Sequence, residues 1–235
     1  MVHILTWNIH GAKETSILQL ADTLILNHLD VIMLQEVPNR TWAIQLGRVL
    51  NMTAHFQQTH KNGLGNAVFT SSPVSVVHYT FKKHWFSCAG KRGALAILFD
   101  DVTVVCTHFA ANPTMVEQWC QARELDKFTQ NFGGRHVVIA GDFNAHYFSP
   151  ATWYLRHKGW RDMWRHASIR KHGYKAGCTF SSTFPFQRID YIMTNSPRVS
   201  CRHAYTLDGA FRRQSDHRGL VANLNWVGRT SHTEK

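Results

Sequence analysis

The chain has 235 residues, of which 44% are hydrophobic, so it can build one large core. No apolar run approaches the roughly 20 residues that a membrane-spanning helix needs, which argues against an α-helical membrane protein. The net charge of +11 is uneven: residues 1–150 carry 11 Lys and Arg against 10 Asp and Glu, whereas residues 151–235 carry 15 against 5, which favours a polyanionic partner for the C-terminal part.

The first fifty residues alternate between strand and helix patterns. Residues 2–7 are a β-rich run, and apolar residues then recur at helical spacing from Ile17 to Ile25. Residues 30–34 are a short apolar run of the buried-strand type, and residues 41–50 predict a second helix. Asn8 and Glu36 therefore both fall just beyond predicted strands, where a rigid sheet commonly carries functional loops.

The remaining elements continue this mixture of strands and helices. A meander of strands is predicted at residues 66–69, 74–81, 93–99 and 102–108, then a helix that begins near Pro113 and ends before Gly133 and Gly134. Further predictions are a strand at 136–140, a helical aromatic stretch at 148–164, a basic loop at 166–175, and strands at 189–193, 198–206 and 220–226. We expect one α/β (α+β) domain over residues 1–228, with two packed sheets, helices outside and a flexible tail at 229–235.

The cysteines, histidines and N-terminus give expectations about compartment and metal. Five widely spaced cysteines fit neither a disulfide framework nor a CxxC zinc site, and no basic leader precedes the first strand, so an intracellular monomer is expected. The 16 histidines show no HExxH or similar spacing, so surface and packing roles are expected for most of them.

Four short sequence motifs, called islands below, end in residue types that enzymes use to hydrolyse phosphoesters with a hard metal ion such as Mg²⁺. They are Thr6-Trp7-Asn8, Leu34-Gln35-Glu36, Gly141-Asp142-Phe143-Asn144 and Ser215-Asp216-His217. Carboxylate and amide oxygens are the ligands that Mg²⁺ prefers, and Mg²⁺ needs few protein ligands because it keeps waters and takes phosphate oxygens. Glu36 can hold Mg²⁺, Asn8 is either a neutral oxygen ligand or the orienter of one, and Asp216 is a further candidate ligand.

The other polar residues of these islands can move protons and position phosphate. Asp142 and Asn144 point the same way if the strand before them stays extended, so Asp142 can orient or deprotonate water and Asn144 can hold a phosphate oxygen. His217 is the predicted general base and Asp190 its orienter, since a carboxylate on one ring nitrogen raises the basicity of the other. His108, at the end of another strand, can stabilise or protonate the transition state.

The order of these residues resembles the endonuclease/exonuclease/phosphatase superfamily, which has the fold of deoxyribonuclease I. The resemblance runs from residue 6 to about residue 221. It includes secondary marks of small bacterial-type members: Gly65-Asn66-Ala67, Lys91-Arg92-Gly93, Cys178-Thr179-Phe180 with Thr183-Phe184-Pro185, and Arg188-Ile189-Asp190-Tyr191-Ile192. The superfamily implies a four-layer α/β/β/α sandwich with mostly antiparallel sheets, and phosphoester hydrolysis that depends on Mg²⁺ or Mn²⁺.

The resemblance also implies a role for each matching residue. Metal-site roles fall to Asn8, Glu36 and Asp216, catalytic roles to His108, Asp142, Asn144, Asp190 and His217, and phosphate contacts to Asn66 and Arg92. There is one departure from the pattern. In deoxyribonuclease I an acidic residue shortly after the equivalent of Asn66 partners the histidine matched by His108, whereas neutral Thr70-Ser71-Ser72 occupies that stretch here.

The substrate prediction depends on charge and aromatic residues. Trp153, Tyr154, Trp160 and Trp164 alternate with Arg156, Lys158, Arg161 and Arg165, a pattern that suits phosphate pairing and base stacking and favours nucleic acid, with DNA as the expected substrate. The same tryptophans could instead be the core face of a helix. Alternatives are a sphingomyelinase-like lipid phosphodiesterase at a membrane surface, a retroelement endonuclease domain and a non-catalytic nucleic-acid-binding module. Inositol polyphosphate phosphatases fit less well, because their Pro-Ala-Trp-Cys-Asp-Arg type of motif is replaced by Phe184-Pro185-Phe186-Gln187-Arg188.

Overall fold

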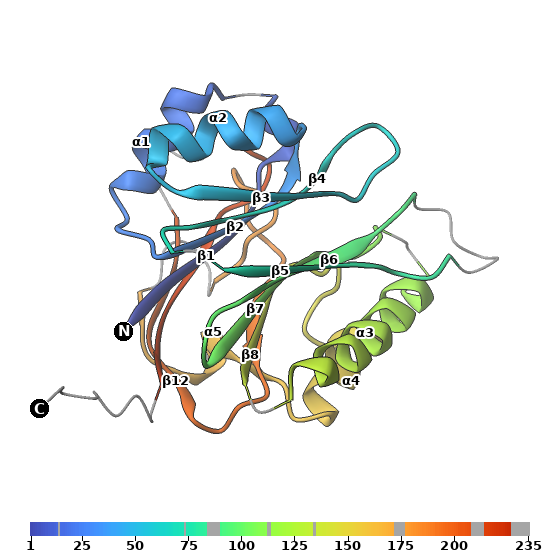
Figure 1. Cartoon of the computed structure of the whole chain (residues 1–235). Coiled ribbons are helices and arrows are strands. Elements are labelled where there is room, and N and C mark those ends of the chain that lie inside the picture. Colours follow the sequence, from blue (N-terminus) through green and yellow to red (C-terminus); the bar gives the residue numbers. More distant parts are fainter. Residues whose placement is uncertain are drawn as a thin grey trace, which may run out of the picture.

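The computed structural model describes residues 1–13, 15–72, 74–83, 90–111, 114–133, 135–171, 177–207 and 214–226. Two mixed β-sheets of seven and six strands pack face to face, and helices cover the outer surface of each (Figure 1). The layers therefore run helix, sheet, sheet, helix, and the four-layer α/β/β/α prediction is confirmed.

The seven-stranded sheet has the order β10-β12-β13-β1-β2-β4-β3. Its strands are β1 (Val2–Asn8), β2 (Val31–Val37), β3 (Thr53–Gln58), β4 (Gly65–Thr70), β10 (Ala167–Lys171), β12 (Val199–Thr206) and β13 (Leu220–Trp226). The helices α1 (Ile17–Ile25) and α2 (Arg40–Leu50) lie on its outer face (Figure 1).

The six-stranded sheet has the order β5-β6-β7-β8-β11-β9. Its strands are β5 (Ser75–Thr80), β6 (Gly93–Leu98), β7 (Val102–His108), β8 (His136–Asp142), β9 (Arg161–Asp162) and β11 (Asp190–Thr194). The helices α3 (Val116–Thr129) and α4 (Pro150–His157) pack on its outer face, and α5 (Met163–His166) is a single turn after β9.

Three hydrophobic clusters fill the spaces between these four layers. Alternation along β1 shows how they arise: Ile4 faces the other sheet, whereas Leu5 and Trp7 face the layer of α1 and α2. All three side chains are fully buried. Strands buried on both faces read as continuous apolar runs, which is why they were recognisable in the sequence.

Parallel pairing in each sheet brings polar strand ends to one edge. β1 runs parallel to β2 with Asn8 opposite Gln35, and β7 runs parallel to β8 with His108 opposite Asp142. β11 is antiparallel to β8, so its first residue, Asp190, also lies opposite Asp142. Residues from distant parts of the chain thereby meet where the two sheets end together.

Some predicted elements differ from the structure. β3 was not predicted, and the helical stretch predicted at 148–164 is wrong between α4 and α5, where the chain leaves the helix and forms β9. The basic loop at 166–175 is wrong in its first half, since β10 occupies residues 167–171. Pro113, Gly134, residues 172–175 and the predicted tail at 229–235 lie outside the described residues.

The described part of the chain contains no helix that is long and apolar enough to cross a membrane. The cysteines within it, Cys106, Cys120, Cys178 and Cys201, form no disulfide with one another, and Cys88 lies outside it.

At Gly141, next to Asp142, the neighbouring strands β7 and β8 approach each other closely. Its φ of +152° is rare for other residues, and an added Cβ would lie 1.8 Å from the carbonyl oxygen of Thr107 on the neighbouring strand. We expect Gly141→Ala to lower the free energy of unfolding by about 3 kcal/mol or more, measured by urea denaturation.

Gly159→Ala is the matched control, because Gly159 also has positive φ, +89°, but no atom of the described residues lies within 4 Å of its added Cβ. Its expected loss is about 1–2 kcal/mol, the conformational penalty alone. Equal losses for the two variants would contradict the close approach of β7 and β8 at Gly141.

Candidate active site

The carboxylate of Asp142 lies at the centre of the site. Its Oδ1 accepts a hydrogen bond from the backbone N–H of Asn144 (2.8 Å), and its Oδ2 accepts one from the amide of Asn8 (3.1 Å). The same Oδ2 lies 3.5 Å from Nε2 of His108 and 3.6 Å from Nε2 of His217. Asp142 is thus a buried anion that contacts residues from three other segments.

Asn8 and Glu36 meet beside Asp142. The Nδ2 group of Asn8 lies 3.3 Å from a Glu36 carboxylate oxygen, while its Oδ1 accepts a hydrogen bond from the backbone N–H of His10. Asn8 therefore has the geometry of the orienting residue, one of the two roles predicted for it. Glu36 lies within β2 at a bulge, with a left-handed φ of 55°, and not beyond the strand as predicted.

His217 and Asp190 form the predicted pair. Nδ1 of His217 lies 2.9 Å from Oδ2 of Asp190, and both side chains are buried. The backbone N–H of Asp190 donates to the hydroxyl of Thr179, which fixes the start of β11. The other ring nitrogen of His217 is thereby directed at Asp142.

Trp7 and Ser215, which had no predicted role, hold the His217 loop against β1. Trp7 Nε1 donates to the backbone carbonyl of His217 (3.0 Å). Ser215 Oγ donates to the carbonyl of Asn8 (2.6 Å) and accepts from the N–H of His217 (3.1 Å). Both residues belong to the islands that the sequence singled out, so their presence there was the available signal.

His108 is buried between Asn144 and a histidine that the sequence did not indicate. Its Nε2 lies 3.1 Å from the amide nitrogen of Asn144, which also donates to the Phe109 carbonyl. The ring of His60 packs against the His108 ring, with centroids 5.1 Å apart. Asn144 has a φ of 47°, so the extended backbone assumed after Asp142 does not continue, and the Asn144 amide braces His108 in this structure.

Arg92 provides positive charge to the site. It interacts electrostatically with Glu36, Asp142 and Glu117. Asn66, the other residue expected to contact phosphate, is fully buried in β4, and its amide donates to the carbonyl of Gly93 next to Arg92. Arg92 is therefore placed to meet an anion, whereas Asn66 supports the backbone beside it.

Asp216 is more exposed than its neighbour His217, with 42% of its side chain accessible against 5%. Its carboxylate lies 3.7 Å from Nδ1 of His10 and 3.4 Å from the hydroxyl of Ser215. Its predicted metal role stays a prediction, because these contacts join it to His10 and Ser215 and not to Glu36.

Burial and nearby charges shift the pKa values of Asp142, His217 and His108 in different directions. Burial raises the pKa of Asp142 to about 7, against the opposing effect of His217. Burial lowers the pKa of His217, but the carboxylates of Asp190 and Asp142 outweigh it and raise that pKa to about 10. Burial, together with the charge of Arg92, holds the pKa of His108 well below its usual value. Near neutral pH, His217 is a cation, His108 is neutral and Asp142 can gain or lose a proton.

The model of the endonuclease/exonuclease/phosphatase family matches residues 5–217 of the chain. A structure described as an endonuclease/exonuclease/phosphatase from Beutenbergia cavernae has 20% identity and a TM-score of 0.79, covering 97% of this chain and 72% of that one. The mannosyl-6-phosphatase of Bacteroides thetaiotaomicron has 15% identity and a TM-score of 0.80, covering 96% and 100%. TDP2 of D. rerio, complexed with a single-strand DNA product, has 18% identity and a TM-score of 0.71, covering 95% and 98%.

These comparisons establish the family. The chain belongs to the endonuclease/exonuclease/phosphatase family, and by class it is a metal-dependent phosphoester hydrolase with a buried cluster of acidic and histidine side chains. The solved structures, all below 25% identity, show the shared fold. The comparison with curated proteins gave no match.

The His217–Asp190 pair makes stability depend on pH. Because the folded pKa of His217 is raised to about 10, its contribution is complete below the unfolded value and is lost as pH rises through about 10. We expect Asp190→Asn to lower the free energy of unfolding by about 3–5 kcal/mol near neutral pH, since it breaks a buried ion pair. The deficit should shrink as pH approaches the folded pKa.

Urea unfolding across that pH range and NMR titration of the His217 ring measure both effects. Asp22→Asn, at an exposed position on α1, is the control and should change stability by no more than about 0.5 kcal/mol. A deficit that does not vary with pH, or a His217 pKa that stays unchanged in Asp190→Asn, would refute the assigned ion pair.

Proposed function

We propose that the chain is a nucleic-acid phosphodiesterase of the endonuclease or exonuclease type, with DNA as the expected substrate and Mg²⁺ or Mn²⁺ as cofactor. The observation that carries the proposal is the convergence of Glu36, Asp142 and His217 beside a half-buried arginine, Arg92. Such a site can neutralise a phosphodiester, accept a proton from water and stabilise a leaving oxygen.

Glu36 is the residue proposed to hold the divalent ion. Its carboxylate is half-buried, Asn8 orients it, and the bulge in β2 directs it out of the strand ladder. One carboxylate with water suits Mg²⁺, which uses few protein ligands. Asp216 is proposed as a further metal ligand. When bound, the ion supplies Lewis acidity that withdraws charge from the phosphate oxygens.

The pKa values of the site favour Asp142 as the group that takes a proton from the attacking water. A pKa of about 7 suits a base near neutral pH, whereas His217 already holds its proton between two carboxylates. The His217 imidazolium can then stabilise the developing negative charge or protonate the leaving oxygen. As water forms the new P–O bond, the bond to the leaving oxygen breaks.

Exposed phenylalanines lie in the segments after β8 and before β11, and one of them connects to the site through a neighbouring ring. Phe184 and Phe186 are 75% and 62% exposed, and Phe186 packs edge-on to Phe180, whose ring lies 5.0 Å from that of His217. Phe148, beyond the end of β8, is 78% exposed. Rings beside a scissile phosphate suit the stacking of unpaired bases.

The predicted stacking role of the tryptophans between residues 153 and 164 is mostly wrong. Trp160 and Trp164 are 1% and 4% exposed, and Trp160 donates a hydrogen bond to Asp126. Trp153 is 56% exposed and stacks on His157. Trp160 and Trp164 are therefore core residues, which was the alternative interpretation of the pattern. Exposed rings such as Phe186 are more accessible to a substrate than these two tryptophans are.

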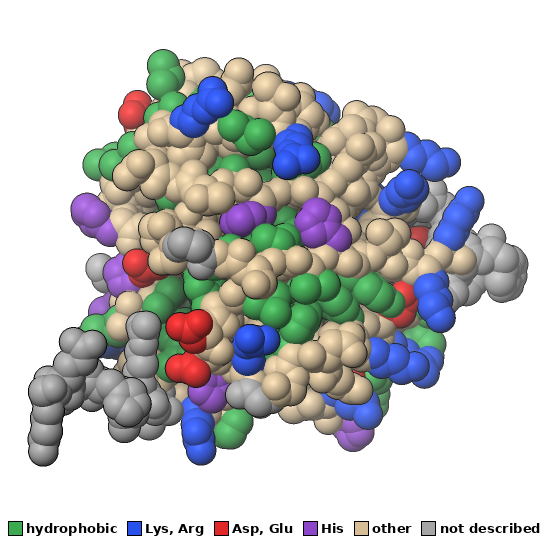
Figure 2. Space-filling view, viewed as in Figure 1, with side chains coloured by type: hydrophobic (Ala, Val, Ile, Leu, Met, Phe, Trp, Pro, Cys, Tyr) green, Lys and Arg blue, Asp and Glu red, His purple; other side chains and the backbone are tan. Residues whose placement is uncertain are grey.

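The charge of the surface supports a polyanionic substrate. Lysine and arginine side chains are spread over the face drawn in Figure 2, and they outweigh acidic ones on the side where α3 lies. Electrostatic attraction of this kind favours phosphate backbones over neutral substrates. We also propose a monomeric state and an intracellular, reducing compartment; the compartment is supported by the cysteines of the described residues, which form no disulfide with one another.

Glu36→Gln tests the metal role. It removes the negative charge but keeps the shape, so hydrolysis should fall by about 10³-fold through loss of metal binding, while circular dichroism stays unchanged. Asp101→Asn is the control: this exposed carboxylate precedes β7, at the end opposite His108. Full activity of Glu36→Gln would refute the proposed metal site.

The same assay separates the candidate substrates. Wild-type protein should cut plasmid or single-stranded DNA with Mg²⁺ and lose this activity with a chelator. Turnover of sphingomyelin vesicles without cleavage of DNA or RNA would establish the lipid phosphodiesterase instead. Binding of an oligonucleotide without turnover of any substrate would establish the binding module.

Phe186 tests whether the exposed rings stack on bases. Phe186→Ala should raise the KM for single-stranded DNA by about tenfold and leave kcat nearly unchanged, because a stacked base contributes about 1–3 kcal/mol. Phe186→Tyr keeps the ring and should restore KM, whereas Phe186→Leu should not. If Phe186→Leu also restored KM, the side chain would act through its apolar surface, as in insertion into a membrane. That result would contradict base stacking.

A further inference from the structure

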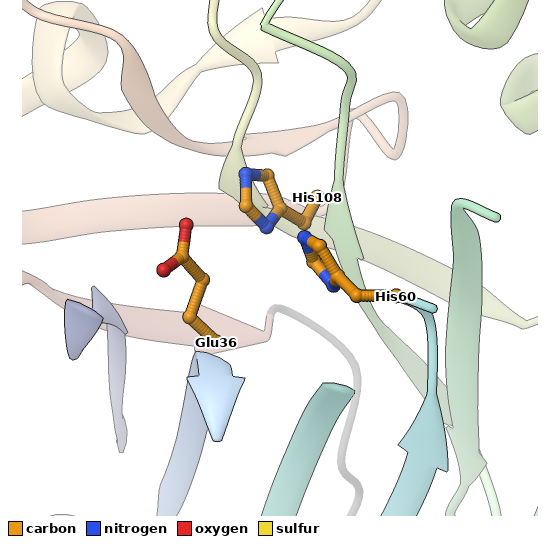
Figure 3. A group of neighbouring side chains, drawn as sticks. All are labelled: Glu36, His60 and His108. Carbon is orange, nitrogen blue, oxygen red and sulfur yellow. The ribbon is translucent and has the colours of Figure 1, made fainter. Parts of the chain in front are cut away.

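Glu36, His60 and His108 form a group of metal-binding side chains at the mouth of the site. Each offers one ligand atom, and these atoms all lie within 4.8 Å of one another. Figure 3 shows the three side chains directed toward a common space from the end of β2, the segment after β3 and the end of β7. Three separate strands therefore contribute to one cluster.

His108 has a ring nitrogen that nothing else uses. Its side chain is 2% exposed, and among the described residues Nδ1 has no hydrogen-bond partner. Its other nitrogen, Nε2, lies 3.5 Å from the Asp142 carboxylate. Histidines that bind metals commonly donate their second N–H to a carboxylate, which fixes the ring and raises its basicity. Binding a metal at Nδ1 of His108 would place the ring proton on Nε2, toward the Asp142 carboxylate, in exchange for the present 3.1 Å contact of Nε2 with the Asn144 amide nitrogen.

His60 completes the imidazole pair. Its Nδ1 lies 3.2 Å from the hydroxyl of Thr59, so that contact leaves Nε2 available. In Figure 3 a nitrogen of the His60 ring faces a nitrogen of the His108 ring. The two ring planes are tilted by 50°. Two imidazole nitrogens and one carboxylate oxygen thus converge.

We propose that Glu36, His60 and His108 bind a borderline divalent metal ion of the Zn²⁺ or Co²⁺ type. Imidazole nitrogen suits these ions, whereas Mg²⁺ prefers oxygen and keeps its waters. Two histidines and a glutamate are a known zinc ligand set that leaves a fourth position open. His60 was among the histidines for which surface or packing roles were expected, and His108 was expected to be catalytic; the proposal gives both a role as metal ligands.

The proposal uses Glu36 but does not rest on phosphodiesterase activity, because binding is measured without substrate. A borderline ion and Mg²⁺ would compete for the Glu36 carboxylate. Arg92 places a positive charge nearby, and it interacts with Glu36, Asp142 and Glu117, which offset that charge. The neighbouring group Asp142, Asp190 and His217 is a weaker candidate, because its oxygen and nitrogen atoms are already directed at one another.

Calorimetric titration of the metal-free protein with Zn²⁺, and Co²⁺ titration followed by visible absorption, test the site. Wild type should bind one ion with a Co²⁺ spectrum of nitrogen-containing, low-coordinate type. His60→Ala should weaken Zn²⁺ binding by at least about 100-fold and abolish that spectrum. His78→Ala, an exposed histidine on β5, is the matched control and should bind as wild type does.

Equal Zn²⁺ affinity in wild type and His60→Ala, or an octahedral oxygen-type Co²⁺ spectrum in wild type, would overturn the proposal. Circular dichroism of His60→Ala excludes unfolding as the cause of lost binding, and His60→Gln provides a second variant of similar size. DNA hydrolysis with Mg²⁺ is measured separately. Zn²⁺ binding without hydrolysis would leave this site in place and refute the phosphodiesterase, and the reverse result would refute this site alone.

Discussion

The buried carboxylate of Asp142 is the group on which the arrangement of the site depends. A carboxylate without water is unstable unless donors or positive charges compensate it, and here the compensation comes from Asn8, the Asn144 backbone and His217. These partners lie on β1, beyond β8 and before β13. Satisfying one charge therefore fixes the relative positions of both sheets at this edge.

The need to hold these partners around Asp142 explains why the short islands of the sequence also contain residues that take no part in catalysis. Trp7 and Ser215 bind the backbone of the His217 loop and of Asn8, so they hold a catalytic segment against a core strand. Gln35 exchanges hydrogen bonds with Thr6 between β1 and β2. Reactive groups can stay in place because such neighbours hold the backbone segments that carry them.

Much of the fold was predictable because buried strands read as apolar runs, and Val102–His108 and Leu220–Trp226 have the predicted bounds. β3 was not predictable in this way. It is the edge strand of its sheet, most of it is only partly buried, and its sequence Thr53–Gln58 lacks an apolar run. His60 follows this strand, so no local pattern pointed to it. Its proximity to His108 follows from the packing of the two sheets, because β3 and β7 belong to different sheets.

Glu36 lies between two different sets of possible metal ligands. Its left-handed backbone and the bulge in β2 place one carboxylate between the oxygen and amide groups of Asn8 and Asp142 on one side and the two imidazoles on the other. Hard ions prefer the first environment and borderline ions the second, because ligand softness differs. One carboxylate cannot serve both at full affinity. The choice of ion is therefore set by the side chains around Glu36, of which His60 is the one that the motif pattern does not contain.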